Sequence, residues 1–296
     1  MAPTKLNQSR AAELIIRISE TGVSRNLAKP NSLTSLGTQR DYKVCVKSYL
    51  DWRDDNGLSK GSQDKKADLI HYLKEQSENY QQKTLCQHRM ALNAAFFKKL
   101  PPVKSLLDTV QSSRDYRLSE VLLLTQNIEP KNAIAILLCF YSGLRAHELA
   151  TLQRTNEGER NNTRSWSKEL FANFCQHVTY VVIGKGGLRR HVAIPTELSK
   201  IIEARRLPEP RKVRDREIYY QMNYDLGFGK ALSQSFSRAS IKHLGWSTGL
   251  HGLRHSYTKN RIRHLIKMDF SLDAAKLIVS QELGHFRPSI VNCYMR

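Results

Sequence analysis

In the first hundred residues, apolar side chains recur at intervals of three and four, which is the period of an amphipathic α-helix. Tyr42, Cys45 and Tyr49 follow this spacing, and two later stretches repeat it. The pattern predicts helices over residues 38–55, 65–78 and 82–99. We therefore expect residues 1–104 to form a small, all-helical domain.

A linker and a second group of elements are expected next. Consecutive prolines in LPPVKS, residues 100–105, prevent a helix from continuing and favour an extended chain. Further on, the β-branched runs HVTYVVI and LRRHVAI flank a glycine-rich turn, which is typical of a β-hairpin. Helices are predicted over residues 118–126, 130–141, 229–242, 253–267 and 272–283. Residues 105–296 should thus form a mixed α/β domain that is mainly α, with one small antiparallel sheet.

The charge of the chain points to an anionic partner. The sequence holds 47 Lys and Arg against 27 Asp and Glu, a net charge of +20, and such a surplus attracts polyanions. No block of consecutive basic residues forms an amphipathic membrane anchor, so we expect nucleic acid rather than a membrane as the partner. In the first domain, the candidates for DNA contact lie on or beside one predicted helix: Lys83, Arg89, Lys98 and Lys99.

The remaining composition indicates a cytoplasmic protein. No apolar run reaches the roughly 20 residues that cross a bilayer, and the N-terminal residues lack the apolar core of a secretory signal. Five cysteines without CxxC spacing do not suit a disulfide framework, so free thiols are expected. The sequence also lacks HExxH, paired CxxC and clustered carboxylates, and we therefore expect no metal site.

Three short strings carry the candidate chemistry: SGLRAHEL at residues 142–149, HGLRHSY at 251–257 and LGHFRPSIVNCY at 283–294. Each is weak alone, because GLRxxEL is more often an ordinary helix start and a tyrosine near a C-terminus is usually without a chemical role. Their order, with Lys185 in the glycine turn between them, is not explained in that way. Together they resemble the two sequence boxes of the tyrosine site-specific recombinases of the phage-integrase type. The resemblance begins near Leu118, and the first domain agrees only in size and position.

The resemblance implies a two-domain enzyme that cuts and rejoins DNA. Residues 1–104 would be a core-binding domain that clamps DNA, and residues 105–296 would be the catalytic domain. Cleavage would give a 3′-phosphotyrosyl intermediate without a cofactor or a metal ion. Four protomers would act on two double-stranded recombination sites, with accessory DNA-bending proteins as further partners. The setting it implies is a bacterial nucleoid, with a phage or another mobile element as the source.

The resemblance also assigns roles to single residues. Tyr294 would be the nucleophile, Lys185 the general acid for the departing 5′-oxygen, and Glu148 and His255 supporting residues. The two histidines of the boxes would donate hydrogen bonds to the phosphate and assist proton transfer. The complete catalytic set that it implies is Arg145, Lys185, His251, Arg254, His285 and Tyr294.

The chemistry of these residue types agrees with those roles. Guanidinium groups match two phosphate oxygens at once, and Arg145 and Arg254 are both expected at helix N-termini, where backbone N–H groups favour an anion. His251 and Arg254 are three residues apart, so they would share a helix face. Glu148, three residues after Arg145, would hold that arginine by an i, i+3 pair. A tyrosine with an ordinary pKa near 10 needs a proton acceptor or a cationic site before it can attack.

Two features depart from the family pattern. Relatives continue past the tyrosine with a tail that docks on the neighbouring subunit, whereas only two residues follow Tyr294 here. Residues 153–176 form a long polar stretch that we expect to pack on the surface as an insertion. Two other classes of function stay open. One is a type IB topoisomerase-like nicking and closing enzyme that uses the same residues on one duplex, and the other is a non-catalytic DNA-binding regulator.

Overall fold

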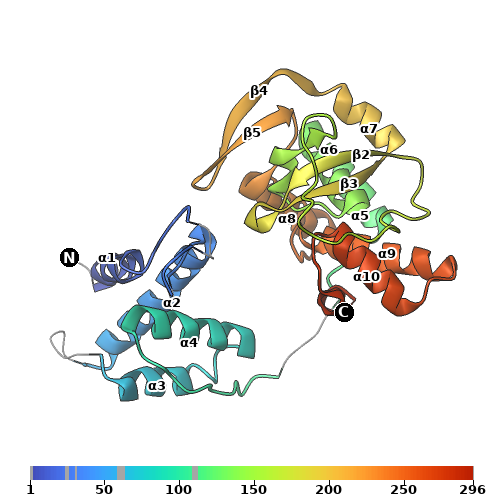
Figure 1. The fold of residues 1–296 in the computed structure, drawn as a ribbon. Coiled ribbons are helices and arrows are strands. Elements are labelled where there is room, and N and C mark those ends of the chain that lie inside the picture. Colours follow the sequence, from blue (N-terminus) through green and yellow to red (C-terminus); the bar gives the residue numbers. More distant parts are fainter. Residues whose placement is uncertain (1–2, 24–26, 31, 59–63, 109–112, 296) are drawn as a thin grey trace. The chain divides into compact units, whose positions relative to one another are not determined.

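A computed structural model describes residues 3–23, 27–30, 32–58, 64–108 and 113–295. The chain divides into two compact units, Met1–Val110 and Gln111–Arg296 (Figure 1). This division falls a few residues beyond the boundary expected after residue 104, and the roles expected for the two parts stay predictions. No described helix is both long and apolar enough to cross a membrane.

In the described part of the first unit the regular elements are helices, and one isolated β-bridge joins Ser19 to Leu33. Its helices are α1 (Pro3–Ile16), α2 (Leu36–Asp55), α3 (Lys66–Glu75) and α4 (Gln82–Phe96). The three predicted helices are present with ends that differ by a few residues. Helix α1 was not predicted, because its polar sequence has no clear apolar stripe; Ala11 and Ile15 nevertheless pack into the core against α2. The core is rich in aromatic rings, with Tyr49 edge-on to Tyr72 at 5.5 Å between ring centroids.

The second unit is a mixed α/β domain, as predicted. It combines helices and 3-10 turns with two small antiparallel sheets, of which the two-stranded one extends from the edge of the unit (Figure 1). In chain order the elements are α5 (Leu118–Gln126), α6 (Pro130–Ser142), η1 (Glu148–Thr151), β1 (Gln153–Arg154), β2 (His177–Ile183), η2 (Lys185–Gly187), β3 (Arg189–Pro195), α7 (Thr196–Glu203), β4 (Arg206–Asp215), β5 (Ile218–Tyr224), α8 (Gly229–Leu244), α9 (Gly252–Lys267), α10 (Leu272–Glu282) and η3 (Pro288–Cys293).

The predicted hairpin is present, and the second sheet is a correction to the expected single sheet. Strands β2 and β3 pair from His177↔Pro195 to Ile183↔Arg189, and β1 adds a short third strand. The pair β4 and β5 was missed because prolines and charges interrupt the apolar alternation in RLPEPRKVRD. Its register shifts between Arg206 and Arg211, which is how the sheet accommodates those prolines.

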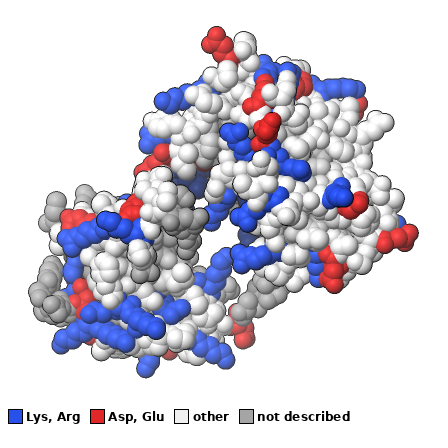
Figure 2. Space-filling model, in the orientation of Figure 1, with Lys and Arg blue, Asp and Glu red and all other residues white. Residues whose placement is uncertain are grey.

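Two apolar clusters support the site in the second unit. The larger one surrounds α6, whose residues Ala135, Ile136 and Leu138 are fully buried. The smaller one joins α9, α10 and η3, which carry the C-terminal strings of the sequence, and it includes Tyr294. Tyr294 is therefore anchored to the same packed body as the two preceding helices. On the face drawn in Figure 2, Lys and Arg predominate over Asp and Glu, in keeping with the net charge of +20.

Candidate active site

Arg145 is held in a tight turn after α6. Gly143 ends the helix with a left-handed backbone (φ 60°), and a Cβ there would lie 2.7 Å from Cδ1 of Tyr257. The backbone N–H and the guanidinium of Arg145 both donate to the Glu148 carboxylate, at 2.9 and 2.7 Å. The expectation that Arg145 begins an α-helix is wrong, because only the 3-10 turn η1 follows it. A carboxylate, rather than a helix N-terminus, orients this arginine.

Glu148 links two arginines in the interior of the unit. Its fully buried carboxylate accepts from Arg145 and also from the guanidinium of Arg190 at 2.8 Å. Burial alone would raise the pKa of this carboxyl, but the guanidinium groups of Arg190 and Arg145 outweigh burial and hold the pKa well below its usual range. The i, i+3 pair expected for Glu148 is thus present as one half of a buried Arg–Glu–Arg group.

Arg190 is a site residue that the sequence analysis missed. It lies on β3 with its side chain almost fully buried, and it also donates to the backbone carbonyl of Glu282 at 2.6 Å. Its contacts therefore join the hairpin, the Arg145 turn and the end of α10. A signal was available, because Arg190 is in phase with the buried Val192 and Ile194 and so falls on the inward face of the strand.

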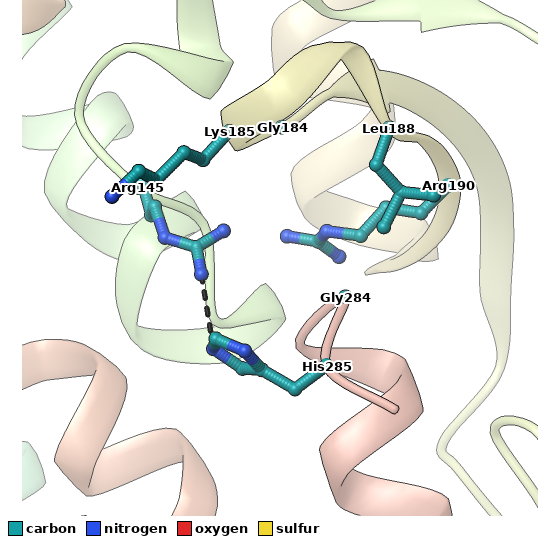
Figure 3. Close-up of a pocket in the computed structure, with 7 residues that line it drawn as sticks. All are labelled: Arg145, Gly184, Lys185, Leu188, Arg190, Gly284 and His285. Carbon is teal, nitrogen blue, oxygen red and sulfur yellow. Dashed lines mark hydrogen bonds between the residues drawn. The ribbon is translucent and has the colours of Figure 1, made fainter. Parts of the chain in front are cut away.

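A pocket of about 170 Å³ opens beside this group. In Figure 3 the guanidinium groups of Arg145 and Arg190 point toward one another across the pocket, and His285 approaches Arg145 from the loop after α10. The charged groups here are cations, so the pocket suits an anion such as a phosphodiester. Its lining consists of Arg145, Gly184, Lys185, Leu188, Arg190, Gly284 and His285.

His285 contacts Arg145 through a hydrogen bond that defines its proton position. Nε2 of His285 lies 3.1 Å from a guanidinium nitrogen of Arg145. Because a guanidinium only donates, Nε2 must accept, and a neutral His285 then carries its proton on Nδ1. Burial and the charges of Arg254 and Arg145 lower the pKa of His285 to about 4. The ring is therefore neutral near pH 7 in the protein without DNA.

Arg254 is fully buried in the first turn of α9, as the sequence predicted for its helix position. Its guanidinium donates to the backbone carbonyls of Gly143 and Leu283, and its Nε donates to the Tyr294 hydroxyl at 3.3 Å. Burial and the nearby charge of Arg145 lower the pKa of Arg254 to about 10, so it stays protonated at neutral pH. One guanidinium thus ties together segments from all three sequence strings.

Tyr294 directly follows η3, which Pro288 begins, as expected. The side chain is only 7% exposed, and its ring lies over the Arg254 guanidinium, 5.8 Å from centroid to Cζ. Three imidazoles surround the ring. Their centroids lie at 4.9, 5.7 and 6.4 Å for His255, His251 and His285, respectively. The tyrosine ring is thereby placed beside one cation and three imidazoles, and its hydroxyl accepts from Nε of Arg254.

His251 and His255 differ in exposure but share a lowered pKa. His251 immediately precedes α9 and reaches the surface, while His255 is buried and lies with Nδ1 3.3 Å from the Tyr294 carbonyl. The surrounding protein and the charge of Arg254 lower the pKa of His251 to about 4. Burial and Arg114 lower the pKa of His255 to about 4. Both rings are therefore neutral at pH 7, and each offers one donor and one acceptor.

Lys185 lies on the turn η2 between β2 and β3, where the sequence located it. Its side chain is exposed and lines the pocket at the opposite end of the hairpin turn from Leu188. Within the described residues, its ammonium forms no hydrogen bond or ion pair. The turn therefore brings a cation to the pocket without fixing it there.

Comparison with solved structures identifies the fold of this chain. The XerH site-specific recombinase, in a post-cleavage complex with a palindromic difH substrate, matches with a TM-score of 0.60 and 14% identity, over 99% of this chain and 93% of that chain. A lambda integrase dimer on a COC′ core site matches with a TM-score of 0.56 and 15% identity, over 99% and 77%. The chain has the tyrosine recombinase fold. By sequence, it matches no family model and no curated protein.

In this fold, Arg145 bonds to His285, and Arg254, His251 and His285 lie against Tyr294. Lys185 lines the same pocket as Arg145 and His285.

The residues predicted to contact DNA in the first unit differ in exposure. Lys83, Lys98 and Lys99 are exposed, the last two beyond the end of α4. Arg89 is half-buried and donates to the Leu100 carbonyl at 3.2 Å, so it supports the fold of its own unit.

No metal-binding arrangement accompanies the pocket in the described part of the chain. Groups of three or more His, Cys, Asp or Glu side chains that could hold an ion are not found there. The pocket instead gathers Arg145, Arg190 and Lys185, with the buried Glu148 already paired to both arginines. Its residues fit a phosphate group better than a cation.

The lowered histidine pKa values predict a loss of stability in mild acid. The pKa values of His251, His255 and His285 fall from 6.5 to about 4 on folding. Between these values the unfolded chain binds more protons, so the free energy of unfolding decreases as the pH falls from 6.5 toward 4. We expect the unfolding temperature of the second unit at pH 5 to be at least about 3 °C below its value at pH 7, which is roughly 1 kcal/mol. Calorimetry checks this, and equal unfolding temperatures would contradict it.

Proposed function

We propose that this chain is a site-specific DNA recombinase that cuts a DNA strand with Tyr294 and forms a 3′-phosphotyrosyl intermediate. The observation that carries the proposal is the hydrogen bond from the buried Arg254 to the Tyr294 hydroxyl. It holds a potential nucleophile against a cation that can also bind the phosphate under attack. The pocket cations Arg145 and Lys185 support the same function, because phosphoryl transfer depends mainly on positioned positive charge.

In the proposed cleavage step, the Tyr294 oxygen forms a bond to phosphorus while the bond from phosphorus to the 5′-oxygen breaks. The phenolic proton passes to the neutral imidazole of His251, whose lowered pKa keeps this ring unprotonated before DNA binds. The leaving 5′-oxygen takes a proton from the Lys185 ammonium. The protein is then joined to the 3′-phosphate, and the DNA has a free 5′-hydroxyl.

Rejoining reverses these transfers. A 5′-hydroxyl attacks the phosphotyrosine and gives its proton back to Lys185, and the Tyr294 oxygen leaves and recovers a proton from imidazole. The phosphotyrosine bond conserves the energy of the broken phosphodiester, so the proposed reaction needs neither a nucleotide nor a metal ion. When the attacking hydroxyl comes from a second duplex, the product is a recombined strand.

For assembly, we propose four protomers on two double-stranded recombination sites, acting in a mobile element that integrates, excises or resolves DNA. The XerH and lambda integrase structures contain DNA sites of this kind. A nicking and closing enzyme of the topoisomerase type would use the same residues on one duplex. Joining of strands from two differently labelled duplexes favours the recombinase, and relaxation of supercoils without such joining favours the alternative.

Replacing Lys185 by alanine is expected to slow cleavage by at least about 100-fold, because the 5′-oxygen then leaves without a proton donor. A DNA substrate with sulfur at the 5′-bridging position should be cut at close to the wild-type rate, since a thiolate leaves without protonation. Cleavage rates on the two substrates, measured at saturating DNA, check this. Equal losses on both would show that Lys185 is only a turn residue.

In the first unit, we propose that the exposed lysines at the two ends of α4 bind the DNA backbone. Changing Lys83, Lys98 and Lys99 to glutamine should reduce the slope of log affinity against log salt by up to about 2.7, since each lost phosphate contact removes about 0.9. A matched removal of three exposed lysines from the N-terminus and body of α3 (Lys65, Lys66 and Lys74) is the control. Binding titrations at several salt concentrations give both slopes, and an equal change in the control set would refute the assignment to α4.

The proposed function is tested by trapping the intermediate. DNA sites are first selected with the full chain from a random-sequence library, and then rebuilt with a nick close to the cleavage position. A short fragment diffuses away after cleavage and prevents rejoining, so the protein stays attached to DNA. A covalent protein–DNA band is expected on denaturing gels. A protein that binds its selected site and never forms this band would instead be a DNA-binding regulator.

A further inference from the structure

A segment that the proposed function leaves without a role crosses the surface of the second unit beside the pocket. It comprises residues 155–176, between β1 and β2, and we refer to it as the strap. Although it is irregular over most of its length, its backbone and side chains are bonded to three other segments. These are the loop that carries His285, helix α9 and the hairpin that carries Lys185.

The strap is bonded to the last turn of α10, just before His285. The backbone N–H of Ser167 donates to the Gln281 side chain at 2.5 Å, and that of Phe171 donates to the Glu282 carboxylate at 3.0 Å. Glu282 is 1% exposed and also accepts from Tyr257 and Arg261. The strap therefore completes a buried polar group whose partial loss leaves a buried charge poorly paired.

A second contact lies immediately after His285. The Trp166 ring meets Phe286 edge-to-face with 4.8 Å between centroids, and the Arg164 guanidinium lies 5.3 Å from the Phe286 ring. Indole Nε1 of Trp166 donates to the Asn161 carbonyl at 2.8 Å, which fixes the ring within the strap. His285 is thus flanked on both sides by residues that the strap holds.

Two further parts of the strap are hydrogen-bonded to regular secondary structure, namely helix α9 and strand β3. Arg261 and His264 of α9 bond to the carbonyls of Ala172 and Asn173, each at 2.6 Å. Asn161 exchanges two hydrogen bonds with the backbone of Arg189 on β3. The strap, which contacts Phe286, is therefore itself held by α9 and by β3, the strand that follows Lys185.

The His285 loop depends on such support because it has little structure of its own. It spans only the few residues between α10 and η3, and Gly284 adopts a left-handed backbone (φ 75°) against the Arg190 side chain. Arg190 packs on one side of this loop and Trp166 on another. Since a displacement of about 1 Å can cost roughly 100-fold in rate, the packing of this loop bears directly on the chemistry.

We propose that Trp166 is a positioning residue that acts through Phe286 to hold His285 against Arg145. The proposal rests on the proposed function for its kinetic consequences, but the position of His285 is measurable without any cleavage. It assigns the strap a part in aligning the site.

The kinetic experiment compares Trp166→Ala with Trp166→Phe in the full chain, on the trapping substrate. With alanine, cleavage at saturating DNA should fall on the order of tenfold to 100-fold, while the dissociation constant for DNA changes less than about twofold. Phenylalanine keeps a ring for Phe286 and should recover most of the rate. Tyr219→Ala, which removes an exposed ring from β5, is the matched control and should cleave normally. Normal cleavage by Trp166→Ala, or an equal loss in the control, would overturn the proposal.

A double-mutant cycle separates positioning from general support of the fold. If Trp166 acts through His285, adding Trp166→Ala to His285→Ala should lower the rate less than about twofold further, because the two changes are not additive. A full additional loss would overturn the proposal. Should the alanine variant fold poorly, Trp166→Leu is used in its place.

The second readout is the imidazole of His285 in the free protein, followed by NMR titration. Loosening the loop should expose the ring to water and raise its midpoint of titration in Trp166→Ala, with little change for His251. An unchanged His285 titration would overturn the proposal even if cleavage fell. If the wild-type protein forms no covalent complex but His285 still shifts, the proposed function fails and the positioning contact stands.

Discussion

Tyr294→Phe is expected to form no covalent complex with DNA on a nicked trapping substrate. The change removes the hydroxyl whose oxygen forms the bond to phosphorus in the proposed cleavage step. DNA affinity should change by less than about fivefold, because a single lost hydrogen bond is worth about 1 kcal/mol. Denaturing gels report the covalent complex, and filter binding or fluorescence anisotropy reports the affinity.

The fold of this variant should be retained, because the ring, rather than the hydroxyl, packs into the cluster of α9, α10 and η3. The hydroxyl itself accepts a hydrogen bond from Arg254. Tyr224→Phe is a suitable control, since it removes a buried hydroxyl of the same unit that bonds to Glu203, outside the site. A covalent complex that persists in Tyr294→Phe would show that another residue is the nucleophile.

Arg254→Lys should lower cleavage by about 10² to 10³, the usual effect of losing one aligned donor to a developing charge. The lysine keeps the positive charge but cannot donate at once to the carbonyls of Gly143 and Leu283 and to the Tyr294 hydroxyl, as the guanidinium does. The loss should therefore appear in the cleavage rate at saturating DNA, more than in affinity. Single-turnover kinetics on the trapping substrate measure it.

Two controls accompany this variant. Arg263→Lys makes the same exchange at an exposed position of α9 and should leave cleavage within about twofold of wild type, as expected for a surface exchange. Arg254 is buried, so the unfolding temperature of Arg254→Lys is measured alongside its activity. Cleavage at the wild-type rate by a folded Arg254→Lys protein would contradict the role proposed for the guanidinium.

The predicted helices are present with ends that differ by a few residues, whereas the amphipathic helix α7 was not predicted. The helix predicted over residues 118–126 has the ends of α5, and the hairpin strands lie where the β-branched runs indicated. Among the other elements that escaped detection, two did so for physical reasons. Helix α1 buries few side chains and is mostly polar, and β4 contains prolines that a strand tolerates only at an edge or an irregularity.

For the candidate site, the order of the three strings was informative because the hydrogen bonds of Arg254 join all three of them. Those strings predicted Arg145, Arg254, His285 and Tyr294 as neighbours, and their contacts are present in the structure. Spacing along the chain could not reveal Arg190, whose partner Glu148 is far away in sequence, or Trp166, which contacts Phe286 only after folding. Such partners depend on tertiary packing, on which a local pattern carries no information.

The wrong expectation at Arg145 has the same origin. GLRAHEL was interpreted as the first turn of an α-helix, but the chain forms only the 3-10 turn η1 and then enters β1. The buried carboxylate of Glu148 replaces the helix N-terminus as the group that fixes Arg145. Local propensity was overridden by a buried ion pair with Arg190, from a strand about 40 residues later.

The central claim is that Tyr294 becomes joined to a DNA 3′-phosphate, and mapping the attachment tests it most directly. The trapped complex is digested with nuclease and protease, and mass spectrometry identifies the peptide that retains a nucleotide. The account predicts a single modified peptide with the nucleotide 3′-phosphate on Tyr294 and a free 5′-hydroxyl on the released strand. Attachment at any other residue, or through a 5′-phosphate, would contradict it.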